Sequence, residues 1–263
     1  MHLPDGFLNN QMSVGLIAVA IGFLAVSFKQ LKKSLFEKVT VIKSQLVLAD
    51  GPTTESSASQ KSVLSQKGLE KIRLMAVISS LIFAMQMINF PVINGTSGHL
   101  IGGVLAAIVL GPWAGLLVIS IVLIVQSLVF ADGGLLALGA NIINMGLVAS
   151  VAGYFIYRLS IKSIKCFRHE PKAIGLWPKG GLASGGKPVK PWRFLIIGIT
   201  AWLTVVLASF FCAVEIGWSG TIDFALVISA MVKIHLLIGI GEALLTVLII
   251  KALKLKLYYE RHF

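Results

Sequence analysis

The first two residues, Met1 and His2, carry three nitrogen atoms that can bind one metal ion together. These are the terminal amine, the next backbone amide and Nδ1 of the imidazole, which close a five-membered and a six-membered chelate ring. A bulky residue at position 2 disfavours removal of the methionine, so we expect Met1 to keep a free amine. Pro4 and Gly6 then shape the segment, because proline fixes φ and glycine permits positive φ. The sequence therefore predicts a stiff tridentate chelate.

The fourth donor to this chelate is predicted to be His99. Three coplanar nitrogens leave one corner of a square plane open, and that geometry is typical of Ni(II) or Cu(II), with Co(II) as a relative. His99 lies in the stretch NFPVINGTSGHLIGG, whose glycines indicate irregular backbone. His2 alone would predict only an ordinary exposed residue. A second histidine on the same face of a membrane favours the metal site instead.

The composition requires a membrane to position these residues. Apolar residues make up 56% of the 263, charged residues 13%, and the mean hydropathy is +0.89, far above the balance of a soluble domain. Several apolar stretches approach the length of about 17–25 residues that crosses a bilayer. We predict an all-α membrane protein, a single domain over 1–263, with seven transmembrane helices. They run over 12–28, 72–90, 99–111, 113–130, 136–157, 194–214 and 224–250.

The positive charges predict how the bundle is oriented. Segments 29–73, 158–193 and 251–263 hold nine, nine and four Lys or Arg, which is 22 of the 23 in the chain. With seven spans these segments share one side, and the positive-inside rule makes that side cytoplasmic. The N-terminus is then outside and the C-terminus cytoplasmic. The acidic residues expected in outer loops are Asp5, Asp132, Glu215 and Asp223.

Two cytoplasmic segments belong to the same predicted domain, a linker over 29–71 and a basic loop over 158–193. Residues 50–66 are rich in Ser and Thr and are predicted to be a flexible linker. Topology explains the net charge of +12, so no nucleic-acid partner is expected, and the basic side offers a contact for anionic membrane lipid or an acidic partner.

Five stretches of the sequence carry further information as a set. They are MHLPDGFL at the start, NFPVINGTSGHLIGG, GPW at 111–113, DGGLLALGANIINM at 132–145 and HLLIGIGEALLT at 235–246. Together they resemble the metal-binding membrane component of energy-coupling-factor (ECF) cobalt/nickel importers, the CbiM/NikM family. The resemblance implies a seven-helix protein of the bacterial or archaeal cytoplasmic membrane that binds Ni(II) or Co(II) near its outer face. The implied ligands are Met1, His2 and His99.

The same resemblance implies partners. These are a separate transmembrane coupling subunit and cytoplasmic ATPase subunits, with or without a small accessory membrane subunit. The sequence holds no GxxxxGK[ST] stretch, so the ATPase is expected to be another subunit. The metal is transported substrate and not a catalytic cofactor, with cobalt serving cobalamin biosynthesis. Small residues along one side of the first span offer either a surface for the coupling subunit or packing within this chain. They are Gly15, Ala18, Gly22 and Ala25.

Polar residues at membrane depth are candidates for supporting the ligands, because they are costly there unless paired. Asp132 is expected to accept an imidazole N–H or to cap the fifth helix. In the seventh span, His235 and Glu242 are expected to pair with other helices or with Lys233 rather than to do chemistry. The further candidates are Asn141 and Asn144, three residues apart on one helix face, and Gln126, with less weight.

Two functions of other classes stay open. A stand-alone secondary permease would need an acidic path for a coupling ion, and Glu242 is the only carboxylate expected within a span. A membrane metalloenzyme would need an open metal position and a general base, yet the sequence has no HExxH motif. We therefore expect a transport component and not an enzyme.

Overall fold

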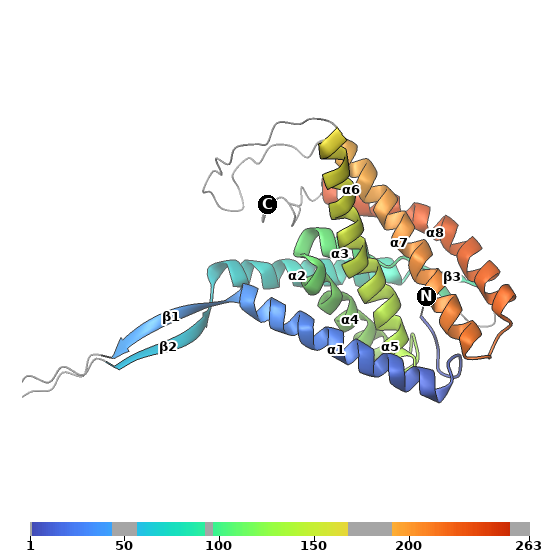
Figure 1. Cartoon of the computed structure of the whole chain (residues 1–263), viewed down its shortest axis with the longest axis horizontal. Helices are drawn as coiled ribbons and strands as arrows, with labels where there is room; N and C mark the ends of the chain where they lie inside the picture. Colours follow the sequence, from blue (N-terminus) through green and yellow to red (C-terminus); the bar gives the residue numbers. More distant parts are fainter. Residues whose placement is uncertain (1, 44–56, 93–96, 168–190, 253–263) are drawn as a thin grey trace, which may run out of the picture.

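The computed structural model describes residues 2–43, 57–92, 97–167 and 191–252, which form a helical bundle with one projecting hairpin (Figure 1). One long rod of the bundle is continuous through α5 (Leu138–Asn141), the π-helix η1 (Ile142–Ala152) and α6 (Gly153–Phe167). The other helices are α1 (Asn10–Leu35), α2 (Gln66–Gln86), α3 (Gly103–Leu110), α4 (Pro112–Val129), α7 (Pro191–Trp218) and α8 (Phe224–Ala252).

Five helical segments are long and apolar enough to cross a membrane, namely α1, α4, the rod over Leu138–Ile164, α7 and α8. They coincide with five of the seven predicted spans, and the prediction of a largely helical membrane protein is confirmed. The prediction for 99–111 differs most. Only Gly103–Leu110 is helical there, about 12 Å at 1.5 Å per residue, and all eight residues are buried in the bundle. The count of seven spans therefore stays a prediction.

Two short sheets qualify the all-α prediction. Strands β1 (Phe36–Lys43) and β2 (Ser57–Leu64) pair in antiparallel register, from Phe36 opposite Leu64 to Lys43 opposite Ser57. The prediction of a flexible linker was therefore wrong for 57–64. The run Val-Thr-Val-Ile in β1 favours extended backbone, and the second strand satisfies its hydrogen bonds. The hairpin points away from the helices (Figure 1).

The second sheet carries one of the predicted ligands. Strands β3 (Asn89–Pro91) and β4 (Ser97–His99) pair antiparallel, with Asn89 opposite His99. The chain then runs from β4 through Leu100–Gly102 into the buried helix α3. His99 therefore lies on an ordered strand at the entrance to the core.

One predicted loop residue belongs to a helix instead. Glu215 was expected in an outer loop, but α7 continues to Trp218, and the Glu215 carboxylate is buried and accepts a hydrogen bond from Nδ2 of Asn144 at 2.7 Å. Asp223 does lie in the loop between α7 and α8. Its carboxylate accepts a hydrogen bond from the N–H of Leu226 at 2.9 Å and so caps α8.

Candidate metal centre

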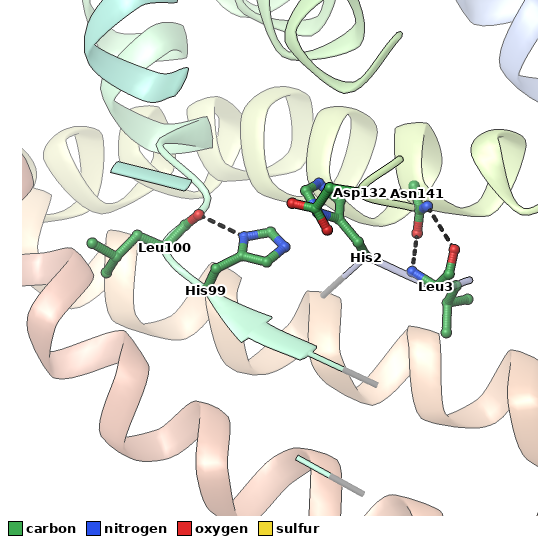
Figure 2. Close-up of polar contacts among 6 residues, drawn as sticks. All are labelled: His2, Leu3, His99, Leu100, Asp132 and Asn141. Carbon is green, nitrogen blue, oxygen red and sulfur yellow. Dashed lines mark hydrogen bonds and ion pairs between the residues drawn. The ribbon is translucent and has the colours of Figure 1, made fainter. Parts of the chain in front are cut away.

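The segment before α1 turns back toward the bundle (Figure 1), and hydrogen bonds hold it there at Leu3. The N–H of Leu3 donates to Oδ1 of Asn141 at 2.9 Å, and Nδ2 of Asn141 donates to the carbonyl of Leu3 at 3.3 Å (Figure 2). The N–H of Gly134 donates to the same carbonyl at 2.8 Å. Further along, Oγ1 of Thr221 donates to the carbonyl of Phe7 at 2.7 Å. Both the N–H and the carbonyl of Leu3, the residue next to His2, are therefore hydrogen-bonded.

Asp5 is a positioning residue that the sequence reasoning missed. Its carboxylate accepts hydrogen bonds from the N–H groups of Leu135, Leu136 and Ala137, at 3.2, 2.8 and 3.3 Å. A side chain at Gly134 would overlap both the carboxylate and the backbone nitrogen of Asp5. Backbone N–H groups just before a helix need acceptors, and that need was the available signal.

The fold brings His2 and His99 together although 97 positions separate them. Their ring centroids lie 4.1 Å apart, with a 39° angle between the ring planes. Both side chains are buried, with 3% of His2 and 1% of His99 exposed. Figure 2 shows His99 at the end of β4 and His2 from the N-terminal segment close beside it, next to Asp132. Two imidazoles in contact and away from bulk water are suited to one shared metal ion.

His99 is oriented by its own backbone. Its Nδ1 lies 2.9 Å from the carbonyl oxygen of Leu100, so Nδ1 donates its proton there (Figure 2). The neutral tautomer then carries its lone pair on Nε2, which is buried and has no hydrogen-bond partner within the described ranges. Metal-binding histidines commonly donate the other ring N–H to a carbonyl in this way. His99 is therefore preset as an Nε2 donor.

His2 has a competing partner. Its Nδ1 lies 3.0 Å from Oδ1 of Asp132, close enough for an ion pair although the pair is not aligned as a hydrogen bond. Burial lowers the pKa of His2 below its ordinary value, while the Asp132 carboxylate opposes that shift. The same contact lowers the pKa of Asp132. The predicted chelate uses this same Nδ1, so Asp132 and a metal ion would compete for it.

Some of the other candidate residues contact His2 or Leu3, and the rest do not. Asn141 holds Leu3, whereas Asn144 bonds to Glu215 on α7 and has no bond to the N-terminal segment. Asp132 contacts His2 and does not cap α5, which begins at Leu138. The side chain of Gln126 is buried and has no hydrogen-bond partner in the part of the chain that the structure describes. Met1 lies outside the described residues.

Of the two kinds of partner predicted for Glu242, another helix or Lys233, the structure shows the first, at the N-terminus of α3. Its two carboxylate oxygens accept the N–H groups of Ile101 and Gly102, both at 2.8 Å, while Lys233 is exposed. The carbonyl of Ile101 accepts a hydrogen bond from Nε2 of Gln86, also at 2.8 Å. A carboxylate on the first N–H groups before α3 is favoured by the helix dipole. Glu242 thus fixes the backbone that follows His99.

Among the described residues, no group of three or more His, Cys, Asp or Glu side chains is arranged to hold a metal ion. Within the described residues, a site built on His2 and His99 would take its further donors from groups other than these side chains. Main-chain nitrogens meet that need, and His2 supplies one. The predicted ligand set of Met1, His2 and His99 stays a prediction.

Replacing Asn141 tests whether fixing Leu3 supports metal binding. Asn141→Leu leaves the buried N–H of Leu3 without its partner, which costs about 1–3 kcal/mol, and it loosens the residue that adjoins His2. We expect Ni(II) affinity to fall about 10-fold, in the range seen for residues that orient ligands. The matched control is Asn144→Leu, which breaks a buried bond away from the histidines. It should lower the melting temperature without changing the Ni(II) affinity, as measured by titration of the purified proteins.

Comparison with known proteins places the chain in a family. Residues 57–257 match the family described as the cobalt uptake substrate-specific transmembrane region, CbiM. This chain belongs to that family. The resemblance seen in the sequence is thereby confirmed, and with its apolar helices the chain is an integral membrane protein.

Several relatives of this CbiM-family chain are named as nickel or cobalt transport proteins. The putative fused nickel transport protein NikMN of Archaeoglobus fulgidus is 35% identical over 248 residues, which are 94% of this chain and 63% of that protein. The probable fused nickel transport protein LarMN of Lactiplantibacillus plantarum is 33% identical over 80% of this chain and 60% of its own length. The chain thus spans under two thirds of these two fused relatives. The cobalt transport protein CbiM of Sorangium cellulosum is 27% identical over 94% of this chain and 88% of its own.

A solved structure agrees with this placement. The crystal structure of a truncated transition metal transporter is 27% identical, with a TM-score of 0.71 over 97% of this chain and 98% of that one. The shared fold therefore extends over nearly the whole chain.

Proposed function

We propose that this protein captures Ni(II) or Co(II) at the outer face of the cytoplasmic membrane for import. The donors are the amine of Met1, the amide and Nδ1 of His2, and Nε2 of His99. One observation carries this proposal: two buried imidazoles are in contact, the His99 ring is oriented by the Leu100 carbonyl, and its Nε2 has no hydrogen-bond partner among the described residues. The names of the nickel and cobalt transport relatives support the choice of metal.

The proposal includes the role of this chain as one subunit of a transporter complex. The CbiM family is a transporter component, and the bound ion is cargo for an ATP-driven ECF complex rather than a catalytic cofactor. A separate transmembrane coupling subunit and cytoplasmic ATPase subunits complete that complex. The distribution of Lys and Arg supports seven spans with the N-terminus outside, because 22 of 23 then share the cytoplasmic side.

Titration of the purified protein with Ni(II), Co(II), Cu(II) and Zn(II) tests the proposal. We expect one tightly bound ion per chain, with Zn(II) weaker because it prefers a tetrahedral site to a square plane. Ni(II) should give the yellow, diamagnetic species of a planar four-nitrogen complex. A protein that binds no Ni(II), or holds it in six-coordinate oxygen-rich form, would contradict the assignment.

Affinity for the metal is expected to fall in acid. The amine must be neutral and the amide must lose its proton before either nitrogen binds, so binding releases at least one proton. By mass action, each unit of lower pH should weaken binding at least about tenfold, which is about 1.4 kcal/mol. Burial already keeps the pKa of His2 low, so its imidazole contributes little to this dependence near neutral pH. Titrations at several pH values measure the slope, and a flat profile would count against a deprotonated amide ligand.

Assays of the purified protein distinguish the two alternative functions, a secondary permease and an enzyme. Uptake of Ni(II) into vesicles by this chain alone would indicate a secondary permease. Turnover of a substrate that His2→Ala abolishes would indicate an enzyme.

A further inference from the structure

An apolar groove runs between α7 and α8, which pack side by side (Figure 1). Its volume is about 620 Å³, within the range of about 300–1,000 Å³ that is typical of small-molecule sites. The lining comes from residues 194–202 of α7 and 240–251 of α8, and Lys251 is its only charged member. None of the lining residues belongs to the candidate metal centre.

The groove lies on a different face of α8 from the one that packs into the bundle. The buried face includes His235, whose Nδ1 donates to the carbonyl of Met231 at 2.7 Å, and Glu242. The residues that line the groove recur three or four positions apart and so form one stripe along the helix. They are Ile240, Ala243, Leu244, Val247, Leu248 and Lys251.

Small residues keep the groove hollow, and a fixed ring borders it. A Cβ at Gly198 would stand 3.7 Å from Cγ2 of Val247 and 3.8 Å from Cβ of Ala243, which are ordinary contact distances. The space is therefore present because residue 198 has no side chain. The indole of Trp202 donates from Nε1 to the carbonyl of Leu236 at 3.0 Å, which ties this part of α7 to α8. The groove is thus formed before any ligand enters.

The groove matches one leaflet of a bilayer in length. From Ile240 to Lys251 the helix rises about 16 Å at 1.5 Å per residue, close to half of a hydrocarbon core of about 30 Å. Lys251 is in the last turn of α8, and its Nζ lies 4.8 Å from the centre of the Phe194 ring near the start of α7. The lysine therefore marks the end of the groove that is predicted to be cytoplasmic.

The charge at this end of the groove is positive. Arg193 adjoins Phe194 in the first turn of α7, so two cations lie at the level where lipid headgroups are expected. The sequence has no Asp or Glu over 191–214 of α7 or 243–252 of α8. A ligand with a long apolar part and one anionic end complements both the lining and the charge.

We propose that this groove binds one anionic phospholipid, with an acyl chain along α7 and α8 and the phosphate beside Lys251. A transmembrane helix of a partner fits the groove less well, because helices that pack in membranes meet through small residues. The exposed rim is instead bulky. Its large residues, each more than half exposed, are Leu195, Ile199, Leu244 and Leu248. A flexible chain can follow such a rim, whereas a rigid helix would rest on top of it.

Native mass spectrometry of the full chain, stripped of lipid in detergent, tests the proposal. The probes are phosphatidylglycerol and phosphatidylcholine with identical acyl chains. We expect one phosphatidylglycerol per chain, bound at least about fivefold more tightly than phosphatidylcholine, the effect of one cation near an anionic headgroup. Lys251→Gln should remove most of this preference. The matched control is Lys233→Gln, an exposed lysine of the same helix outside the groove, which should preserve it.

A second variant tests the groove itself. Gly198→Leu fills the hollow and should weaken the binding of both lipids about tenfold. Gly15→Leu on α1, where a Cβ also meets open space, should change neither. Equal binding of the two lipids by the native chain, or a preference that survives Lys251→Gln, would overturn the proposal. So would a cross-link from Leu244→Cys to a helix of the coupling subunit in the assembled transporter, because the groove would then belong to that partner.

Discussion

Two residues added before Met1 are expected to abolish tight Ni(II) binding by the purified protein. The extension converts the terminal amine into an ordinary amide, which does not bind Ni(II) at neutral pH without losing a proton. The five-membered chelate ring is then lost. Without a metal ion anchored at the amine, the His2 amide no longer loses its proton readily. Residues that only orient a ligand change affinity about 10–100-fold, so loss of two donors should exceed about 100-fold. Competition titration against a chelator measures the change.

The control for this prediction restores the native end. Cleavage by a protease that cuts immediately before Met1 should return full affinity, because the amine and the position of Leu3 are both recovered. A second control separates loss of the amine donor from displacement of the N-terminal segment. Asp5→Asn leaves the amine intact but weakens the acceptor for Leu135–Ala137, and it should reduce affinity less than the extension does. An extended chain that binds Ni(II) normally would contradict a role for the amine.

Much of the helical fold could be predicted from composition alone. Stretches such as those of α7 and α8 are apolar for longer than a bilayer is thick, so their length predicts a span without any structure. Helix α3 shows the limit of this reasoning. The glycines before it and Gly111-Pro112 after it predict a short helix, but its eight residues, GVLAAIVL, are apolar on every side and do not tell whether protein or lipid surrounds them.

The sequence pointed to the two histidines and to two residues beside them, Asp132 and Asn141, but it did not point to the contacts of Asp5 and Glu242. Met1, His2 and His99 stand out because their chemistry suits one metal ion, and the structure brings the two rings together while their role as ligands stays a prediction. The contacts of Asp5 with 135–137 and of Glu242 with Ile101 join residues 130 or more positions apart. Such contacts depend on how the helices pack, and no local pattern encodes them. Asn141 and Asn144 share a helix, yet their partners differ because η1 packs beside both the N-terminal segment and α7.

Removing the single imidazole of His99 should weaken binding less than the N-terminal extension but change the metal spectrum clearly. His99→Asn leaves an amide able to donate to the Leu100 carbonyl and removes Nε2, so β4 keeps its local contact. The three N-terminal nitrogens still hold the ion, and water takes the fourth corner. Affinity should fall about 100-fold, at the upper end of the effect of an orienting residue, and the Ni(II) absorption band should move to longer wavelength because water is a weaker-field donor than imidazole.

The matched control for His99→Asn is His169→Asn, which removes a histidine of the basic loop 158–193 and should alter neither affinity nor spectrum. Added imidazole provides the more demanding test, because a free ring can occupy the vacated corner. If His99 is the fourth donor, imidazole in solution should shift the band of the His99→Asn protein back toward that of the native chain and should leave the native spectrum unchanged. An unshifted band in the variant would mean that the plane is closed by another residue.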